Sequence, residues 1–324
     1  MIGTRGQMAV GAILAGLLPL LGVGCGGSDT TWPNDARPKV VVSFAPIYCF
    51  ATNVAGDDAV VRSVMTTTGP HDFNPTDIEA RLLRKANLFF VNGVGLDTDV
   101  ANALKKGSGN KGLNLVALGD RIPVDQLLEG QCHHDHADGH HHDHGNDPHV
   151  WLSPDFAVLM TETIRDELKA ADPDHAANYD RRAAEYVGKL RKLKADGREQ
   201  LKGKADRKLV TFHESLAYFA QAFDLSIEGV VQKKPGVEPN QDEIKELLAV
   251  CREKQVRLIA VEPQYTANTS AKTIIGELTR NGKVADAALV EIDPLETVNP
   301  AALTPEWYEV RMRANLDALA KAMK

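Results

Sequence analysis

From Lys39 onward, short apolar stretches typical of β-strands alternate with longer stretches whose apolar residues recur at helical spacing. This alternation limits the fold most, because consecutive parallel strands need crossover connections, usually helices, and so form sheets covered by helices. The strand-like stretches form two sets of four, at 39–44, 60–65, 86–93 and 113–118, and at 208–212, 225–231, 258–262 and 288–292. Asn74-Pro75 and Ser153-Pro154 each combine an N-cap residue with a following proline, so we expect helices to begin there.

One long helical pattern separates the two sets. Apolar residues recur every three or four positions from Tyr179 to Leu193. A helix of roughly 28 residues spans about 40 Å, enough to reach across two domains. We therefore predict an α/β fold of two Rossmann-like lobes with parallel sheets, at 39–172 and 203–324, bridged by a backbone helix at 173–202.

The N-terminus has the pattern of a secretory signal. Arg5 precedes an apolar run over 8–23, which small residues and Cys25 follow. The stretch "LGVGC" resembles the lipobox of bacterial lipoproteins, so we expect a signal peptide at 1–24, lipidation of Cys25 and a polar tether at 25–38. Plain secretion is the alternative. No other segment is long and apolar enough to span a membrane.

Charge and cysteine content exclude other classes. The formal net charge of the 324 residues is −7, with acids and bases interspersed and no basic block, which argues against a nucleic-acid partner. No CxxC motif occurs, so a thiolate zinc knuckle is excluded. Cys49 and Cys251 lie in apolar helical patterns and are expected in the core, whereas Cys132 is either a soft ligand or a free thiol.

Four residues follow strand-like stretches and are the candidate metal ligands: His71, His149, His213 and Asp293. Ligands of parallel α/β sheets bind at the carboxyl ends of the strands, so these side chains are expected to meet in one cleft between the lobes. Three neutral imidazoles and one carboxylate suit tetrahedral Zn²⁺. Four protein ligands leave no open position, which favours capture of the ion over hydrolysis.

The fourth ligand has alternatives. Glu262 also ends a strand and ranks second to Asp293, or it accepts a hydrogen bond from a liganding imidazole and orients it. Asp293-Pro294 is also compatible with a simple turn. We interpret His175, beside Asp174 in the first turn of the long helix, as a surface residue.

The sequence carries no complete catalytic motif. The stretch "HESLA" at 213–217 has Ala217 where a metalloprotease helix needs its second zinc histidine. No GxSxG, P-loop or post-strand GxGxxG is present, so we expect a binding protein rather than an enzyme. A secreted zinc hydrolase, with three histidines and water as the fourth ligand, is the alternative from another class.

The chain resembles the metal-binding subfamily of bacterial ABC-transporter substrate-binding proteins, in its zinc-uptake branch. The resemblance covers about 39–324 and is carried by segments similar to the four ligand segments of the family, "GPHDFNPTDIEARLLRKANLFFVNG", "DPHVWLSP", "TFHESLAYFA" and "LVEIDPL". It implies two α/β lobes joined by a rigid helix, with the metal between them.

The same resemblance implies a role in transport. It implies capture of Zn²⁺ outside the cytoplasm by a monomer, on a lipid anchor in the periplasm or at the cell surface, and delivery to an ABC permease without an organic cofactor. Manganese-binding members carry a carboxylate where His213 stands, which favours zinc here, although some three-histidine members accept Mn²⁺ or iron. An adhesin-type lipoprotein is a further alternative.

A His-rich loop at 131–147 precedes His149. Its histidines are His133, His134, His136, His140, His141, His142 and His144. With its glycines and charged residues it cannot bury enough apolar surface to order itself. We expect an accessory zinc collector or sensor tethered beside the cleft, or else an insertion with incidental affinity.

Overall fold

The computed structural model describes residues 32–130, 145–233, 237–264, 269–280, 284 and 286–324. The predicted signal peptide at 1–24, Cys25, Cys132 and the seven histidines of the His-rich loop lie outside these residues. All elements described below belong to one compact unit, Asn34–Lys324. Within the described part of the chain, no helix combines the length and the apolar character needed to cross a membrane.

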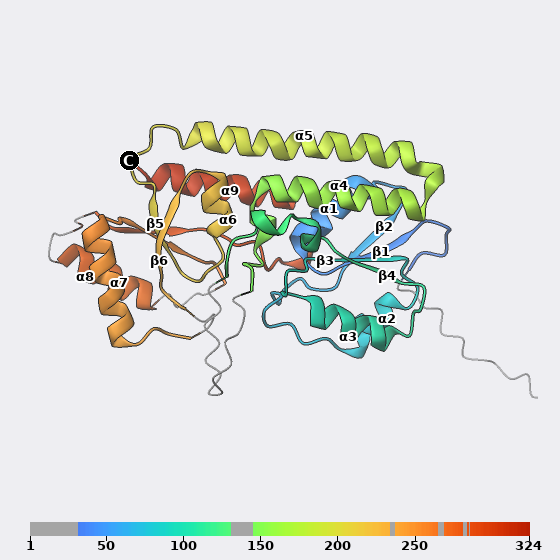
Figure 1. Cartoon of the computed structure of the whole chain (residues 1–324), viewed down its shortest axis with the longest axis horizontal. Helices are drawn as coiled ribbons and strands as arrows, with labels where there is room; N and C mark the ends of the chain where they lie inside the picture. Colours follow the sequence, from blue (N-terminus) through green and yellow to red (C-terminus); the bar gives the residue numbers. More distant parts are fainter. Residues whose placement is uncertain (1–31, 131–144, 234–236, 265–268, 281–283, 285) are drawn as a thin grey trace, which may run out of the picture. The chain divides into compact units, whose positions relative to one another are not determined.

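The first sheet is parallel, with the strand order β2-β1-β3-β4. Its strands are β1 (Lys39–Val42), β2 (Val60–Ser63), β3 (Leu88–Val91) and β4 (Asn114–Ala117). Every residue of β3 is buried, as expected for a parallel strand covered on both faces. Figure 1 shows α1 (Ala45–Ala55) and α4 (Pro154–Ala171) on one side of this sheet, and α2 (Asp77–Leu83) and α3 (Thr98–Ser108) on the other.

The second sheet repeats this arrangement, with the parallel order β6-β5-β7-β8. Its strands are β5 (Lys208–Thr211), β6 (Ser226–Val230), β7 (Leu258–Val261) and β8 (Ala288–Glu291). Its helices are α6 (Ala217–Ala222), α7 (Gln241–Lys254), α8 (Thr269–Arg280) and α9 (Trp307–Ala322). We call β1–β4 with α1–α4 the first lobe and β5–β8 with α6–α9 the second lobe. The predicted α/β class, with two parallel sheets, is confirmed.

Five short 3-10 turns complete the described elements: η1 (Gly119–Arg121), η2 (Val124–Gln126), η3 (Val150–Leu152), η4 (Pro173–His175) and η5 (Pro300–Ala302). The turn η4 leads into the long helix α5 (Ala176–Gln200), so the regular helix begins slightly after the predicted start at 173. His175, in η4, has 46% of its side chain exposed and lies on the surface as expected.

The helix α5 packs against both lobes, on α1 and α4 of the first and on α9 of the second (Figure 1). Gly197 permits the contact with the second lobe. A Cβ atom there would come within 2.6 Å of Leu316 on α9 and of Phe223 just after α6, closer than side-chain atoms pack. The buried apolar side chains of α5 belong to one hydrophobic cluster that includes residues of both sheets.

Short local sequence signals account for where two helices begin. Ser153-Pro154 opens α4 as predicted. The helix predicted from Asn74-Pro75 begins instead at Asp77, because Thr76 and Glu79 form a capping box. The Thr76 hydroxyl accepts a hydrogen bond from the Ile78 N–H at 3.2 Å, and the Glu79 carboxylate accepts one from the Thr76 N–H at 2.8 Å.

Cys49 and Cys251 are free thiols that are fully buried in the two hydrophobic clusters. Burial raises the pKa of Cys49 to about 12 and that of Cys251 to about 11. Both are therefore unreactive core residues, as the sequence predicts.

Candidate metal centre

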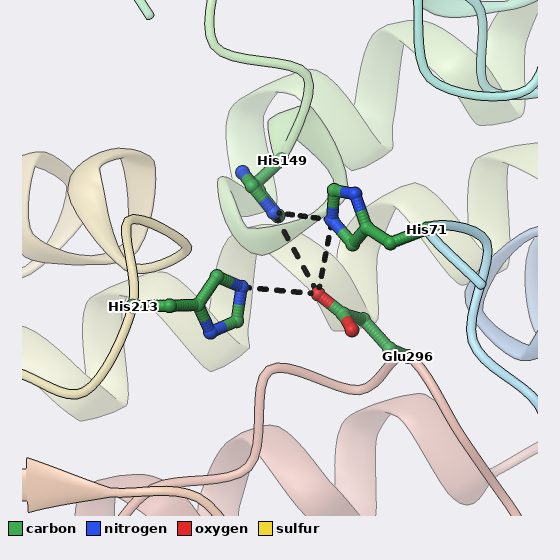
Figure 2. Close-up of side chains that lie close together, drawn as sticks. All are labelled: His71, His149, His213 and Glu296. Carbon is green, nitrogen blue, oxygen red and sulfur yellow. Dashed lines mark hydrogen bonds and ion pairs between the residues drawn. The ribbon is translucent and has the colours of Figure 1, made fainter. Parts of the chain in front are cut away.

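Three imidazoles and one carboxylate come together between the carboxyl ends of the strands. The ligand atoms of His71, His149, His213 and Glu296 all lie within 4.8 Å of one another (Figure 2). The Nε2 atoms of the three histidines lie 3.6, 3.6 and 3.5 Å from Glu296 Oε1, and those of His71 and His149 lie 3.2 Å apart. A tetrahedral zinc ion with bonds of about 2.0–2.1 Å sets neighbouring ligand atoms about 3.3–3.4 Å apart, so the four groups fit such an ion.

Each lobe contributes two of these residues. His71 lies in the loop after β2, and His149 directly precedes η3. His213 lies two residues after β5 and Glu296 five residues after β8. Loops that leave the carboxyl ends of parallel strands are where such sheets bind ligands, and here they bring together side chains far apart in the sequence.

The cluster is buried except on one side. His149, His213 and Glu296 expose only 5%, 3% and 7% of their side chains, whereas His71 exposes 28%. The cluster is therefore most open to solvent at His71.

Carboxylates fix the orientation of two of the rings. Asp147 Oδ1 accepts hydrogen bonds from the backbone N–H of His149 at 2.9 Å and from its Nδ1 at 2.7 Å. Glu262 Oε1 lies 2.5 Å from Nδ1 of His213. Because the carboxylates engage Nδ1, the Nε2 atoms face Glu296, and a neutral ring then directs its lone pair into the cluster.

The charges of the cluster are strongly coupled. Burial disfavours the charged form of His149, but Asp147 and Glu296 raise its pKa to about 9. Burial has the same effect at His213, where Glu262 and Glu296 nevertheless raise the pKa to about 10. Burial also disfavours the carboxylate of Glu296, yet the histidines lower its pKa well below the ordinary value. Protons and a metal cation would therefore compete for the nitrogens of these two histidines.

The oxygen Oε1 of Glu296 is the clearest indication of a bound cation. Glu296 Oε1 is buried and has no hydrogen-bond partner among the described residues, because the three nitrogens around it lie beyond ordinary hydrogen-bond length. A buried charged oxygen without a donor is costly, and an ion bound between it and the nitrogens would remove that cost.

Asp293, which the sequence favours as the fourth ligand, is not part of this group. Its Oδ2 accepts a hydrogen bond from Arg311 Nε at 2.9 Å, and its Oδ1 accepts one from the Leu295 N–H at 2.7 Å. Leu295 has a φ of 64°, a left-handed conformation that is rare for a leucine. Asp293 therefore shapes the turn from which the next residue, Glu296, enters the cluster.

Glu262 was considered either as a fourth ligand or as a residue that orients a liganding imidazole. It lies against Nδ1 of His213 rather than among the Nε2 atoms, which corresponds to the second of these roles. Gln264 holds its other oxygen through a hydrogen bond of 2.8 Å. Sequence reasoning missed Glu296, because it considered only acids directly at strand ends. The available signal was a single acid in the otherwise uncharged stretch "PLETV".

The chain matches the model of a known family over residues 40–322, and this family is described as the zinc-uptake complex component A, periplasmic. The chain is 31% identical over 312 residues to the zinc-binding lipoprotein AdcA of Streptococcus pneumoniae (strain ATCC BAA-255 / R6). The match covers 96% of this chain but 60% of that protein. The chain thus spans less than two thirds of this relative. It is also 28% identical to the high-affinity zinc uptake system protein ZnuA of Bacillus subtilis (strain 168), over 94% of both chains.

Solved structures are similar over the same region. The Zn(II)-bound AdcA from Streptococcus pneumoniae has a TM-score of 0.68 and 26% identity, covering 89% of this chain and 58% of that one. The substrate-binding protein FpvC from Pseudomonas aeruginosa, in complex with Ni²⁺, has a TM-score of 0.73 and 25% identity, covering 89% and 97%. FpvC is also known in complex with Mn²⁺.

Proposed function

Because this chain belongs to the family of the periplasmic component A of zinc-uptake complexes, we propose that it captures Zn²⁺ outside the cytoplasm and delivers it to an ABC permease for import. The observation that carries the proposal is the convergence of three Nε2 atoms on the buried Glu296 Oε1 at 3.5–3.6 Å. The family is one of transport components and not an enzyme family.

We assign His71, His149, His213 and Glu296 as the ligands of the transported ion. Three nitrogens and one oxygen in a compact set suit Zn²⁺, whereas Mn²⁺ prefers more ligands and mostly oxygens. Four protein ligands also leave no position for an activated water, which supports capture rather than hydrolysis. The Ni²⁺ and Mn²⁺ complexes of FpvC indicate that the fold itself does not select the metal.

Release follows from the division of the ligands between the lobes. His71 and His149 belong to the first lobe, and His213 and Glu296 to the second. A small separation of the lobes would therefore break the ligand set into two halves of two ligands, each of which binds zinc weakly. We propose that docking on the permease drives this separation.

The parts outside the described residues complete the proposal. Lipidation of Cys25 would hold the protein at the outer side of a bacterial membrane, which the name of the lipoprotein relative supports. The seven histidines of the His-rich loop would collect zinc ions for the four-residue cluster. We also propose that the domain limits are those predicted from the sequence, with the linking helix at 173–202, and that the protein is a monomer.

Metal analysis and competition titration test this function. The purified protein, titrated with Zn²⁺ against a chromophoric chelator, should bind one ion tightly. His213→Ala should lose the tight site, whereas His175→Ala, which removes an exposed histidine, should retain it. A wild-type protein that loses every competition with the chelator would overturn the proposal. Growth of a deletion strain under zinc chelation separates a transport role from an adhesin role.

A further inference from the structure

Two short segments flank residues 131–144 in the chain, and both are described by the structure. We call Leu128–Gly130 and Gly145–Asp147 the neck. Glu129 and Asn146 form an antiparallel bridge, and the Gly130 N–H donates to the Gly145 carbonyl at 2.8 Å. At the inner end, the Asp147 N–H donates to the Leu128 carbonyl at 2.8 Å.

A side chain from the other lobe completes the inner end of the neck. In an antiparallel pair of strands, two opposite residues placed like Leu128 and Asp147 normally exchange two N–H···O bonds. Here the Leu128 N–H donates instead to the hydroxyl of Tyr218 at 3.0 Å, and that hydroxyl donates to the Asp147 carbonyl at 3.0 Å. The Tyr218 hydroxyl thus replaces the second backbone bond of the pair.

The inner end of the neck is also the support of a candidate ligand. The Asp147 carboxylate receives both the backbone N–H and Nδ1 of His149. The position of Asp147 therefore sets where Nε2 of His149 lies, and the Tyr218 hydroxyl holds the Asp147 backbone together with the Leu128 carbonyl.

Tyr218 belongs to α6 of the second lobe, five residues after His213. It is fully buried, and its ring meets that of Phe156 on α4 edge to face, with 5.4 Å between ring centroids. Its hydroxyl therefore reaches the neck only while α6 rests against the first lobe. An ordinary backbone bond within the neck would have no such requirement.

We propose that Tyr218 is a positioning residue that makes the metal-binding orientation of His149 depend on contact between the lobes. When the lobes separate, the neck loses its bridging hydroxyl, Asp147 is released from its fixed position, and His149 loses its alignment. Separation would then weaken binding both by dividing the ligands and by disordering one of them. This inference rests on the proposed function of zinc capture.

Tyr218→Phe tests the inference, because it removes the hydroxyl and keeps the ring that packs on Phe156. We expect its zinc affinity, measured by chelator competition, to fall about 10- to 100-fold, the usual effect of losing a group that orients a ligand. Tyr179→Phe is the matched control. Its hydroxyl is also buried and donates to Asp172 at 2.7 Å, away from the cluster, so its affinity should stay within about twofold of wild type.

Two further readouts separate positioning from a general loss of stability. The visible absorption of bound Co²⁺, which reports the coordination geometry, should change in Tyr218→Phe and not in Tyr179→Phe. In a His149→Ala background, Tyr218→Phe should cause no further loss of affinity. An equal further loss there would overturn the inference, because Tyr218 would then act by another route.

The test also separates this inference from the function on which it rests. If wild type binds zinc tightly and Tyr218→Phe binds equally well, the inference fails and the proposed function stands. If wild type does not bind zinc, both fail.

Discussion

Replacement of Glu296 by glutamine examines the structural assignment most directly, because the side chain keeps its shape and loses its charge. The binding free energy of a four-ligand zinc site is about 10–16 kcal/mol, so each ligand accounts for about 2.5–4 kcal/mol, or about 10²- to 10³-fold in Kd. The amide oxygen remains a weak ligand, which places the expected loss near about 10²-fold.

A second effect partly opposes this loss. Glu296 raises the pKa of both His149 and His213 in the metal-free protein. Without the carboxylate these pKa values fall, and zinc has fewer protons to displace. Calorimetric titration of Glu296→Gln in buffers of different ionisation enthalpy should therefore detect fewer protons released per ion than in wild type.

Asp293→Asn is the matched comparison, since the sequence favours Asp293 and the structure favours Glu296. The asparagine keeps an oxygen for the Leu295 N–H and loses only the ion pair with Arg311, so zinc affinity should fall less than about tenfold. The reasoning is refuted if Asp293→Asn abolishes tight binding while Glu296→Gln binds like wild type.

Four further outcomes follow from the structure. Chelation of zinc should lower the melting temperature, since an ion at 100 times its Kd stabilises the fold by about 2.7 kcal/mol; equal calorimetric scans would contradict the site. Folding raises the pKa values of His149 and His213 to about 9 and 10. Protonation of these histidines therefore stabilises the metal-free fold fully below their unfolded pKa, and this stabilisation is lost as pH rises through 9–10. Thermal scans should show that loss without zinc and not with saturating zinc. Deletion of 131–144 should leave one tight zinc ion and remove weaker ones, as isothermal titration would measure; loss of the tight ion would assign the site to the His-rich loop. Gly197→Ala should destabilise the fold by about 1–3 kcal/mol in urea unfolding through its close contacts in the second lobe, and unchanged stability would mean that α5 is not closely packed there.

Patterns within short stretches determined most of the architecture. The alternation of strand-like and helix-like stretches was sufficient to predict two parallel sheets, because periodicity and burial are properties of neighbouring residues. The cap-plus-proline signal at Ser153-Pro154 predicted the start of α4 for the same reason. At Asn74-Pro75 the same signal was wrong, since the Thr76 and Glu79 side chains satisfy more of the first-turn N–H groups.

The sequence also predicted that His71, His149 and His213 lie close together, because loops after parallel strands share one edge of the sheet. The structure brings these three residues together, and their role as ligands remains the proposal made above.

Only the tertiary structure shows that Glu296, and not Asp293, faces the three imidazoles. The difference depends on Arg311, on another element, which engages Asp293, and on the left-handed turn at Leu295, which directs the next side chain inward. The hydrogen bonds that join the Tyr218 hydroxyl to the neck likewise depend on residues far apart in the chain. Sequence determines which segments become strands and helices, because those preferences are local, but which atoms meet is set by loop conformations and by partners far away in the chain.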